Sequence, residues 1–179
     1  WEDACPSNLV TDDKIWKGEC YNDSEFSSCL QISGITADAT RYVWLTAAAG
    51  ESFQDHASVR SNALAYDQSK GVGLAANTTN TAGILLYTDY TRIERIQIKQ
   101  AQNNSALRVE DPGSDNLGSL IKDCIFRQDY AGNAVVWCQA IDNSTNFVNC
   151  LIHAAHSGAY GFGQSSGTGA NVINCTIVG

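Results

Sequence analysis

Three short segments of the chain, "KDCIF" (Lys122–Phe126), "VNCLIH" (Val148–His153) and "INCTIV" (Ile173–Val178), repeat one pattern: an acidic or amide residue, a cysteine and apolar residues. The three cysteines follow one another at steps of 26 and 25 residues. A sequence period of roughly 20 to 50 residues indicates stacked structural units. The chain of 179 residues is long enough to bury a core, and the period predicts that this core lies inside a solenoid.

The repeat extends beyond the cysteines when the segments are aligned. The cysteine column begins at an isoleucine and contains Ile96, Cys124, Cys150 and Cys175. Two further columns are apolar, one three residues earlier (Ile93, Ile121, Phe147 and Val172) and one two residues later (Ile98, Phe126, Ile152 and Ile177). Side chains alternate between the two faces of a strand. The residues between the cysteine column and the later column are therefore predicted to point outward; they are Gln97, Ile125, Leu151 and Thr176.

A second strand in each coil is predicted from another set of columns. Leu107, Val135 and Tyr160 form one column, and Val109, Trp137 and Phe162 form the next. If Trp137 points inward, alternation makes Val136 and Cys138 point outward. Outward-pointing Ile125, Leu151 and Val136 would leave apolar groups on the surface, which favours association with other subunits.

Strand columns that share one period predict coils that stack about 4.8 Å apart. The predicted fold class is all-β, a right-handed parallel β-helix. An irregular N-terminal cap is expected over residues 1–40 and the β-helix over residues 41–179. The chain has no methionine, starts at Trp1 and stops within the apolar run "CTIVG". Both ends are therefore expected to be cut, and the β-helix is expected to be truncated at its C-terminal end.

The residue before each repeated cysteine is predicted to form a turn. Asp123, Asn149 and Asn174 tolerate left-handed backbone and can stack as a hydrogen-bonded ladder. A disulfide between neighbouring coils is an alternative for the three cysteines, but parallel stacking rarely gives the Cβ directions that a disulfide requires. The isoleucine at the head of the column favours buried free thiols that fill the core.

The other four cysteines lie outside this column. Cys138 is expected to be exposed, and it is the candidate for an intermolecular contact. Cys5, Cys20 and Cys29 are candidates for a disulfide in the cap, either Cys20–Cys29 or Cys5–Cys29, and the sequence does not choose between the two. No CxxC motif or paired Cys/His spacing suits zinc, so no metal site and no cofactor are predicted.

Charge and hydropathy argue against two classes of partner. The formal net charge is −8, the isoelectric point is about 4.6, and only 11 residues are Lys or Arg. Contacts to phosphates need clustered positive charge, so a nucleic-acid partner is not expected. No apolar run approaches the roughly 20 residues that cross a bilayer, so no membrane span is expected.

One group of outward positions carries positive charge. Lys99, Arg127 and His153 occupy the position one residue past the Ile98 column on three adjacent coils. Such a strip could hold an anionic ligand, for example an acidic sugar. The alternative is an ordinary solvated face whose charges pair with acidic neighbours such as Asp129, and like charges at this spacing favour that alternative unless they are paired.

The acidic residues give no clear catalytic pattern. Glycoside hydrolysis needs two carboxyl groups that face one groove. The turn acids do not share a column on adjacent coils; they are Asp89, Asp111, Asp115, Asp129 and Asp142. His56 follows Asp55 but has no nucleophile at a telling distance. The sequence therefore favours a non-catalytic protein and assigns no catalytic residue.

Several segments resemble β-helix proteins of tailed phages and prophages: "WKGECYNDSEFSSCLQISG" from Trp16, "LTAAAGESFQDHASVRSNALAYDQSKGVGL" from Leu45 and "YTRIERIQIK" from Tyr90. The resemblance covers most of the chain from Trp16 onward. It implies a capped solenoid that serves as a virion component, such as a tail spike, a fibre or a head decoration. A virion or extracellular location would follow. Its partners would be other virion subunits or copies of itself, with a homotrimer or higher assembly expected, and a surface polysaccharide as a further candidate.

Two other functions stay open beside the virion role. The chain could be a fragment of a polysaccharide lyase or glycoside hydrolase, because parallel β-helices often carry such enzymes. It could also be a subunit of a secreted filament that assembles by stacking coils across chains. The resemblance carries over no catalytic motif to residues of this sequence.

Overall fold

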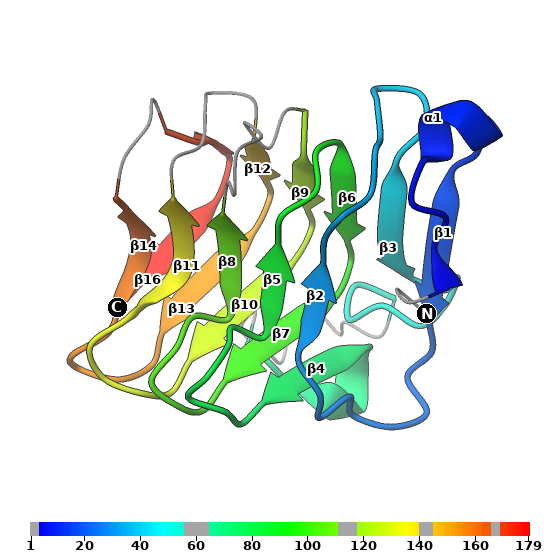
Figure 1. Cartoon of the computed structure of the whole chain (residues 1–179). Coiled ribbons are helices and arrows are strands. Elements are labelled where there is room, and N and C mark those ends of the chain that lie inside the picture. The colour runs from blue at the N-terminus through cyan, green and yellow to red at the C-terminus, as the bar shows by residue number, and fades with distance from the viewer. Residues whose placement is uncertain (1–3, 56–64, 111–117, 140–144, 166–168) are drawn as a thin grey trace.

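A computed structural model gives the structure of the chain and describes residues 4–55, 65–110, 118–139, 145–165 and 169–179. Figure 1 shows parallel strands stacked along one axis as a β-solenoid, with little helix. The described helical elements are α1 (Leu9–Asp12) and η2 (Gln68–Lys70). The predicted all-β fold of stacked parallel strands is confirmed, whereas the right-handed winding stays a prediction. No helix among the described residues is both long and apolar enough to cross a membrane.

Three parallel sheets form the walls of the solenoid. The first sheet contains β1 (Trp16–Cys20), β3 (Val43–Ala47), β6 (Thr91–Glu94), β9 (Leu120–Lys122), β12 (Asn146–Val148) and β15 (Asn171–Ile173). The second contains β4 (Gly73–Ala76), β7 (Gln97–Gln100), β10 (Ile125–Gln128), β13 (Leu151–Ala154) and β16 (Thr176–Val178). The third contains β2 (Leu30–Ile32), β5 (Ile84–Leu86), β8 (Leu107–Glu110), β11 (Ala134–Gln139) and β14 (Tyr160–Gln164).

The strand columns of the first two sheets follow the cysteine period. Ile121 pairs in register with Ile93 and Phe147, and Phe126 pairs with Ile98 and Ile152. All six side chains have no exposed surface and belong to one core cluster. Burial of each such side chain contributes about 1.5–3 kcal/mol to stability. The apolar columns are therefore what holds successive coils together.

The corner between the first and second sheets is built from left-handed residues. Arg95, Asp123, Asn149 and Asn174 have φ of 62°, 54°, 55° and 51°. The Asn149 amide donates to the Asp123 carboxylate (3.2 Å), and the Asn174 amide donates to the Asn149 side-chain oxygen (2.7 Å). Asp and Asn tolerate this backbone because their short polar side chains can bond locally. A sharp corner thus separates the strand of the first sheet from the strand of the second sheet in each of these coils.

The columns predicted for the third sheet are wrong by one residue. Val136 pairs with Leu107 and Phe162, and Cys138 pairs with Val109. Leu107 follows Ile98 by nine positions, whereas Val136 follows Phe126 by ten, so the turn before β11 is one residue longer. A slip of one residue exchanges the two faces of a strand. Val136 and Cys138 accordingly lie in the core, and Trp137 is partly exposed.

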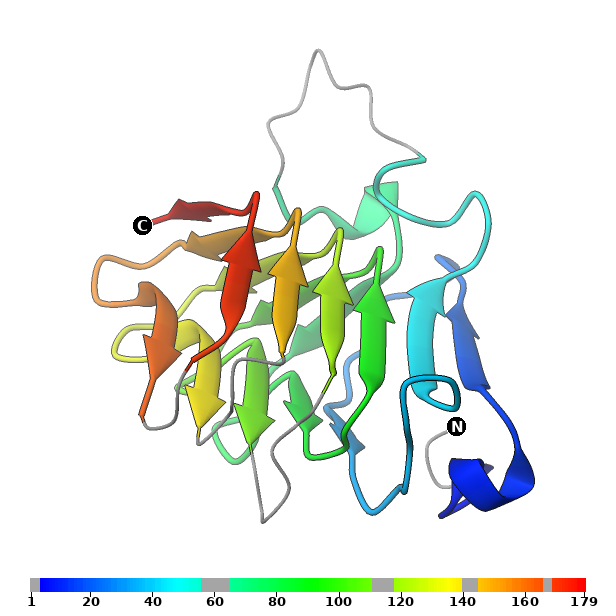
Figure 2. The same ribbon diagram turned by 90° about the horizontal axis from the view of Figure 1, so that it is seen from above.

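The apolar residues expected on the outer face of the second sheet are covered by the chain itself. Ile125 and Leu151 are 2% and 7% exposed, and they form a small cluster with Phe53 and Tyr66. These two aromatic residues come from the described ends of the long connection between β3 and β4, which are cyan and teal in Figure 2. Since Val136 is buried in the core, the expected surface of three apolar residues for subunit association is absent.

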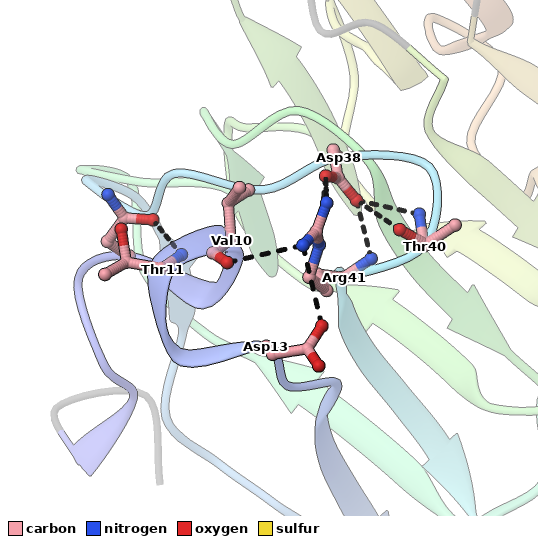
Figure 3. Close-up of polar contacts among 7 residues, drawn as sticks. Val10, Thr11, Asp13, Asp38, Thr40 and Arg41 are labelled. Carbon is pink, nitrogen blue, oxygen red and sulfur yellow. Dashed lines mark hydrogen bonds and ion pairs between the residues drawn. The ribbon is translucent and has the colours of Figure 1, made fainter.

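A short cap closes the N-terminal end of the solenoid. Leu9 of α1 is fully buried in the main core cluster, and the Asn8 side chain caps the helix by accepting from the Thr11 backbone N–H (2.9 Å). Arg41 joins this helix to the turn that precedes β3 (Figure 3): it pairs with Asp38 of that turn (2.5 Å) and donates to the Val10 carbonyl of α1 (3.4 Å).

The Asp38 carboxylate also organises the turn that leads into β3. It accepts from the side chain of Arg41 and from the backbone N–H and hydroxyl of Thr40, which holds the pKa of Asp38 well below its usual range. Strand pairing nevertheless begins before this turn, because β1 pairs with β3 and β2 pairs with β5. The solenoid thus starts at Trp16, inside the range 1–40 expected for the cap.

Candidate functional site

Lys99, Arg127 and His153 lie side by side on the outer face of the second sheet, and together they are called the basic strip here. Arg127 of β10 pairs in register with Lys99 of β7 and with His153 of β13. All three are partly exposed. The register of the basic strip follows from the cysteine period. The three residues that the sequence alignment placed at one outward position therefore lie side by side in the structure.

The basic strip is partly occupied by contacts within the chain. The Arg127 Nε donates to the Asp129 carboxylate (2.5 Å), and the Lys99 ammonium lies 4.8 Å from the centre of the Tyr66 ring. An exposed ion pair of this kind is worth about 0–1 kcal/mol. An anionic ligand can therefore compete for Arg127 at small cost, but the strip is not a bare row of cations.

The cysteine column serves the backbone as well as the core. Cys124 and Cys150 are buried, and Cys175 on the last coil is partly buried. Each thiol approaches the carbonyl two residues before it, at 3.2 Å for Cys124, 3.4 Å for Cys150 and 3.3 Å for Cys175. The weak S–H donor thus bonds to a carbonyl next to the left-handed corner. This contact, together with small size, explains why cysteine recurs at the position.

The remaining four cysteines differ from expectation, because Cys138 is buried and neither candidate disulfide of the cap is formed, Cys20–Cys29 or Cys5–Cys29. Cys138 was predicted to be exposed but is fully buried, because the longer turn before β11 exchanges the inward and outward faces of that strand. Cys5, Cys20 and Cys29 are partly buried free thiols in this structure. Burial raises the pKa of Cys20 to about 11 and that of Cys138 to about 12. High pKa values leave little thiolate at neutral pH, so these thiols are poor nucleophiles.

Thiol titration tests this arrangement. In the folded protein at neutral pH, we expect Cys124, Cys138 and Cys150 to resist a thiol reagent such as Ellman's reagent, because they are buried. In denaturant, the free thiols are expected to number seven. Mass spectrometry after alkylation identifies which cysteines react first. Rapid labelling of Cys138 in the folded state, or a denatured count below seven in fresh protein, would contradict the structure.

The described carboxylates are largely used in local contacts. Ion pairs join Asp55 to Arg95 (2.6 Å) and Asp67 to Lys70 (3.0 Å), and the Tyr87 hydroxyl donates to Glu110 (2.8 Å). Within the described ranges, no group of three or more His, Cys, Asp or Glu residues is arranged to hold a metal ion. His56, Asp111, Asp115 and Asp142 lie outside the described residues. Among the residues that the structure describes, no acid and base pair is therefore assigned to one groove.

Two hollows in the structure were not predicted. One is a groove of about 490 Å³ beside the corner ladder, lined in part by Gln54, Asp123, Asn149 and Asn174. The other is a cavity of about 790 Å³ at the first coil, lined in part by Cys20, Tyr21 and Cys29. The first coil carries no repeat motif, so its sequence offers no signal for the larger cavity. No family model, curated protein or solved structure is similar enough to this chain to count as a match.

Proposed function

We propose that this chain is a structural component of a virus particle, of the decoration, fibre or spike type that tailed phages carry, and that it acts in assembly of the particle or in attachment to the host surface. The observation that carries the proposal is the continuous register of three parallel sheets around one core. Adjacent coils share backbone hydrogen bonds along all three sheets, which makes a stiff body suited to mechanical support.

The chemistry of the side chains supports a structural rather than a catalytic role. The pairs between Asp55 and Arg95, Asp67 and Lys70, and Arg127 and Asp129 stabilise turns or connect neighbouring segments. A hydrolase or lyase needs a carboxylate or base directed at a substrate groove. The contacts of these acids are to their own neighbours, which disfavours the alternative of a polysaccharide-degrading fragment.

The cap disfavours the alternative of a filament built by end-to-end stacking. Such a filament requires the first coil of one subunit to receive the last coil of the next. Leu9 of α1 is buried in the core at the first coil, and Arg41 holds the helix there. Stacking at this end would have to displace α1 and expose Leu9. Attachment of a solenoid to a larger particle requires no such rearrangement.

Attachment to a host surface is supported by the basic strip. A polymer lying along the strip meets basic groups about 4.8 Å apart on successive coils. Many cell-surface polysaccharides are acidic, and an arginine can bind a carboxylate through two parallel hydrogen bonds. The basic strip is therefore the proposed binding site for attachment to the host surface.

Microscopy of the particle tests the proposed function. Virus particles are purified on a density gradient from the source that encodes the chain, and an antibody against the purified protein is used for immunogold labelling. We expect the protein to sediment with the particles and the label to lie on the head or the tail. Recovery only in fractions without particles, or in isolated filaments, would refute the virion role. Pre-adsorbed antibody provides the control.

Binding to an acidic polysaccharide tests the attachment role separately. We expect polygalacturonate to bind the protein in low salt and the double variant Lys99→Glu/Arg127→Glu to lose at least tenfold in affinity, because two attractive charges become repulsive. The control Lys14→Glu/Lys122→Glu makes the same change in net charge at other exposed lysines. Equal losses in the two double variants would show a nonspecific charge effect and refute the strip as the site.

A further inference from the structure

The structure contains a cavity that the proposed function does not use. The first-coil cavity, of about 790 Å³, lies between the segment that joins β1 to β2 and the core of the following coil. In Figure 1 this segment runs below the strands without an arrow of its own. Ligand sites for small molecules have volumes of about 300–1,000 Å³. The cavity is thus large enough for a small organic molecule.

The cavity exists because the first coil lacks a strand in the second sheet. In later coils β4, β7, β10, β13 and β16 fill this place, but in the first coil only Phe26 pairs with β4, through an isolated bridge to Leu74. The Phe26 backbone N–H donates to the Gly73 carbonyl (3.0 Å), and its carbonyl accepts from the Ala75 N–H (2.8 Å). The rest of the segment that joins β1 to β2 does not pair with the second sheet, and the cavity opens onto the core residues beneath it.

The floor of the cavity is apolar. Core side chains from three different strands and their flanks form it: Leu30, Leu45, Val72, Leu74 and Ile96. Tyr21 and Phe26 belong to the wall and are 56% and 42% exposed, which is high for aromatic residues. An apolar floor with exposed aromatic groups gains free energy when an apolar molecule displaces water from it.

The rim of the cavity is acidic. Glu19, Asp23 and Glu25 line it, and Lys17 is the one basic residue among the described residues of the lining. Lys17 is already engaged, because its ammonium lies 2.6 Å from a Glu19 carboxylate oxygen and 4.4 Å from the centre of the Trp44 ring. Asp23 is exposed on the same segment. A positively charged group of a ligand would meet attraction at this rim, and an anionic group would meet repulsion.

We propose that the first-coil cavity binds a small organic cation, with an apolar body against the core floor and an ammonium or related group at the Asp23 rim. The apolar floor provides most of the affinity, and the acidic rim selects the sign of the charge. This inference is independent of the basic strip, which lies on the outer face of the second sheet and favours anions. A negative result here leaves the virion proposal untouched.

Matched ligands test the proposal on the whole protein. The probes are 4-phenylbutylammonium, 4-phenylbutyrate and 4-phenylbutanol, which share one apolar body and differ in charge. We expect the cation to bind at least tenfold more tightly than the anion by isothermal titration calorimetry, with the neutral alcohol between them. Asp23→Asn is expected to reduce the affinity for the cation about two- to fivefold, as for other exposed charge pairs. Equal affinity for cation and anion would overturn the proposed selectivity.

A blocking variant locates the binding site. Ser28 is exposed on the cavity wall, so Ser28→Trp should fill the mouth without disturbing the core. We expect binding of the cation to fall at least tenfold, while Ser157→Trp, at an exposed turn far along the chain, leaves binding unchanged. Circular dichroism checks the folding of both. Methyl NMR gives a second measurement: shifts should occur at Leu45, Val72 and Leu74 but not at Leu107. Binding that survives Ser28→Trp, or shifts elsewhere, would refute the site.

Discussion

Replacing Phe126 by alanine is expected to lower the free energy of unfolding by about 3–5 kcal/mol, as large-to-small changes at buried aromatic residues do. Phe126 has no exposed surface and lies between Ile98 and Ile152 in the column of the second sheet. The neighbouring coils are fixed by backbone hydrogen bonds on both sides, so they cannot close around the space that the ring leaves. The loss should therefore fall in the upper part of this range.

Urea denaturation followed by circular dichroism measures the effect. The matched control is Phe26→Ala, which removes the same ring from a side chain that is 42% exposed. We expect this control to change the free energy of unfolding by about 1 kcal/mol or less, since little apolar surface is lost from the core. If both variants lost the same stability, the column of Phe126 would not be the centre of the core.

The two sheets that meet at the corner ladder could be predicted because their spacing is constant. From Ile121 to Phe126 and from Phe147 to Ile152, a strand, a corner and a second strand follow at fixed intervals. One aligned cysteine then fixes the register of both strands. The basic strip comes from the same alignment, so its members could be named from the sequence alone.

The third sheet could not be predicted as well because turn length varies before it. One added residue before β11 moved Val136 and Cys138 into the core and turned Trp137 toward the surface. Alternation of inward and outward side chains within a strand has a period of two residues, so it does not show whether the preceding turn is one residue longer. Burial of Ile125 and Leu151 depended on Phe53, which is distant in sequence. No local pattern contains that contact.

The first-coil cavity could not be predicted from the sequence for a different reason. It results from a strand that does not form, between Cys20 and Leu30, and a missing strand leaves only a polar segment rich in serine. Such a segment is also typical of an ordinary surface loop. The residues of the apolar floor lie in strands or directly beside them, and packing in the solenoid core already explains their apolar character. Only the spatial arrangement shows that part of this core can be reached from outside.

Asn149→Val is expected to cost about 2–3 kcal/mol of unfolding free energy even though Asn149 is exposed. The residue has φ of 55°, and left-handed backbone costs a residue with an ordinary side chain about 1–2 kcal/mol. The change also removes the ladder bonds to Asp123 and Asn174, and each such bond contributes about 0.5–1.5 kcal/mol, with the lower end fitting an exposed site.

Two control variants separate the backbone cost from the loss of the ladder. Asn149→Gly keeps the left-handed corner and removes only the side-chain bonds, so we expect a loss of about 1 kcal/mol or less. Asn146→Val also breaks an amide contact between coils, the bond from Asn171 (3.1 Å), but it lies in β12, where a β-branched residue is favourable. Its loss should likewise be small. Urea denaturation of the three variants measures these losses. If Asn149→Val and Asn149→Gly were equally destabilised, the corner would not depend on left-handed backbone. Stacking of the amides alone would then explain why Asp or Asn precedes each repeated cysteine.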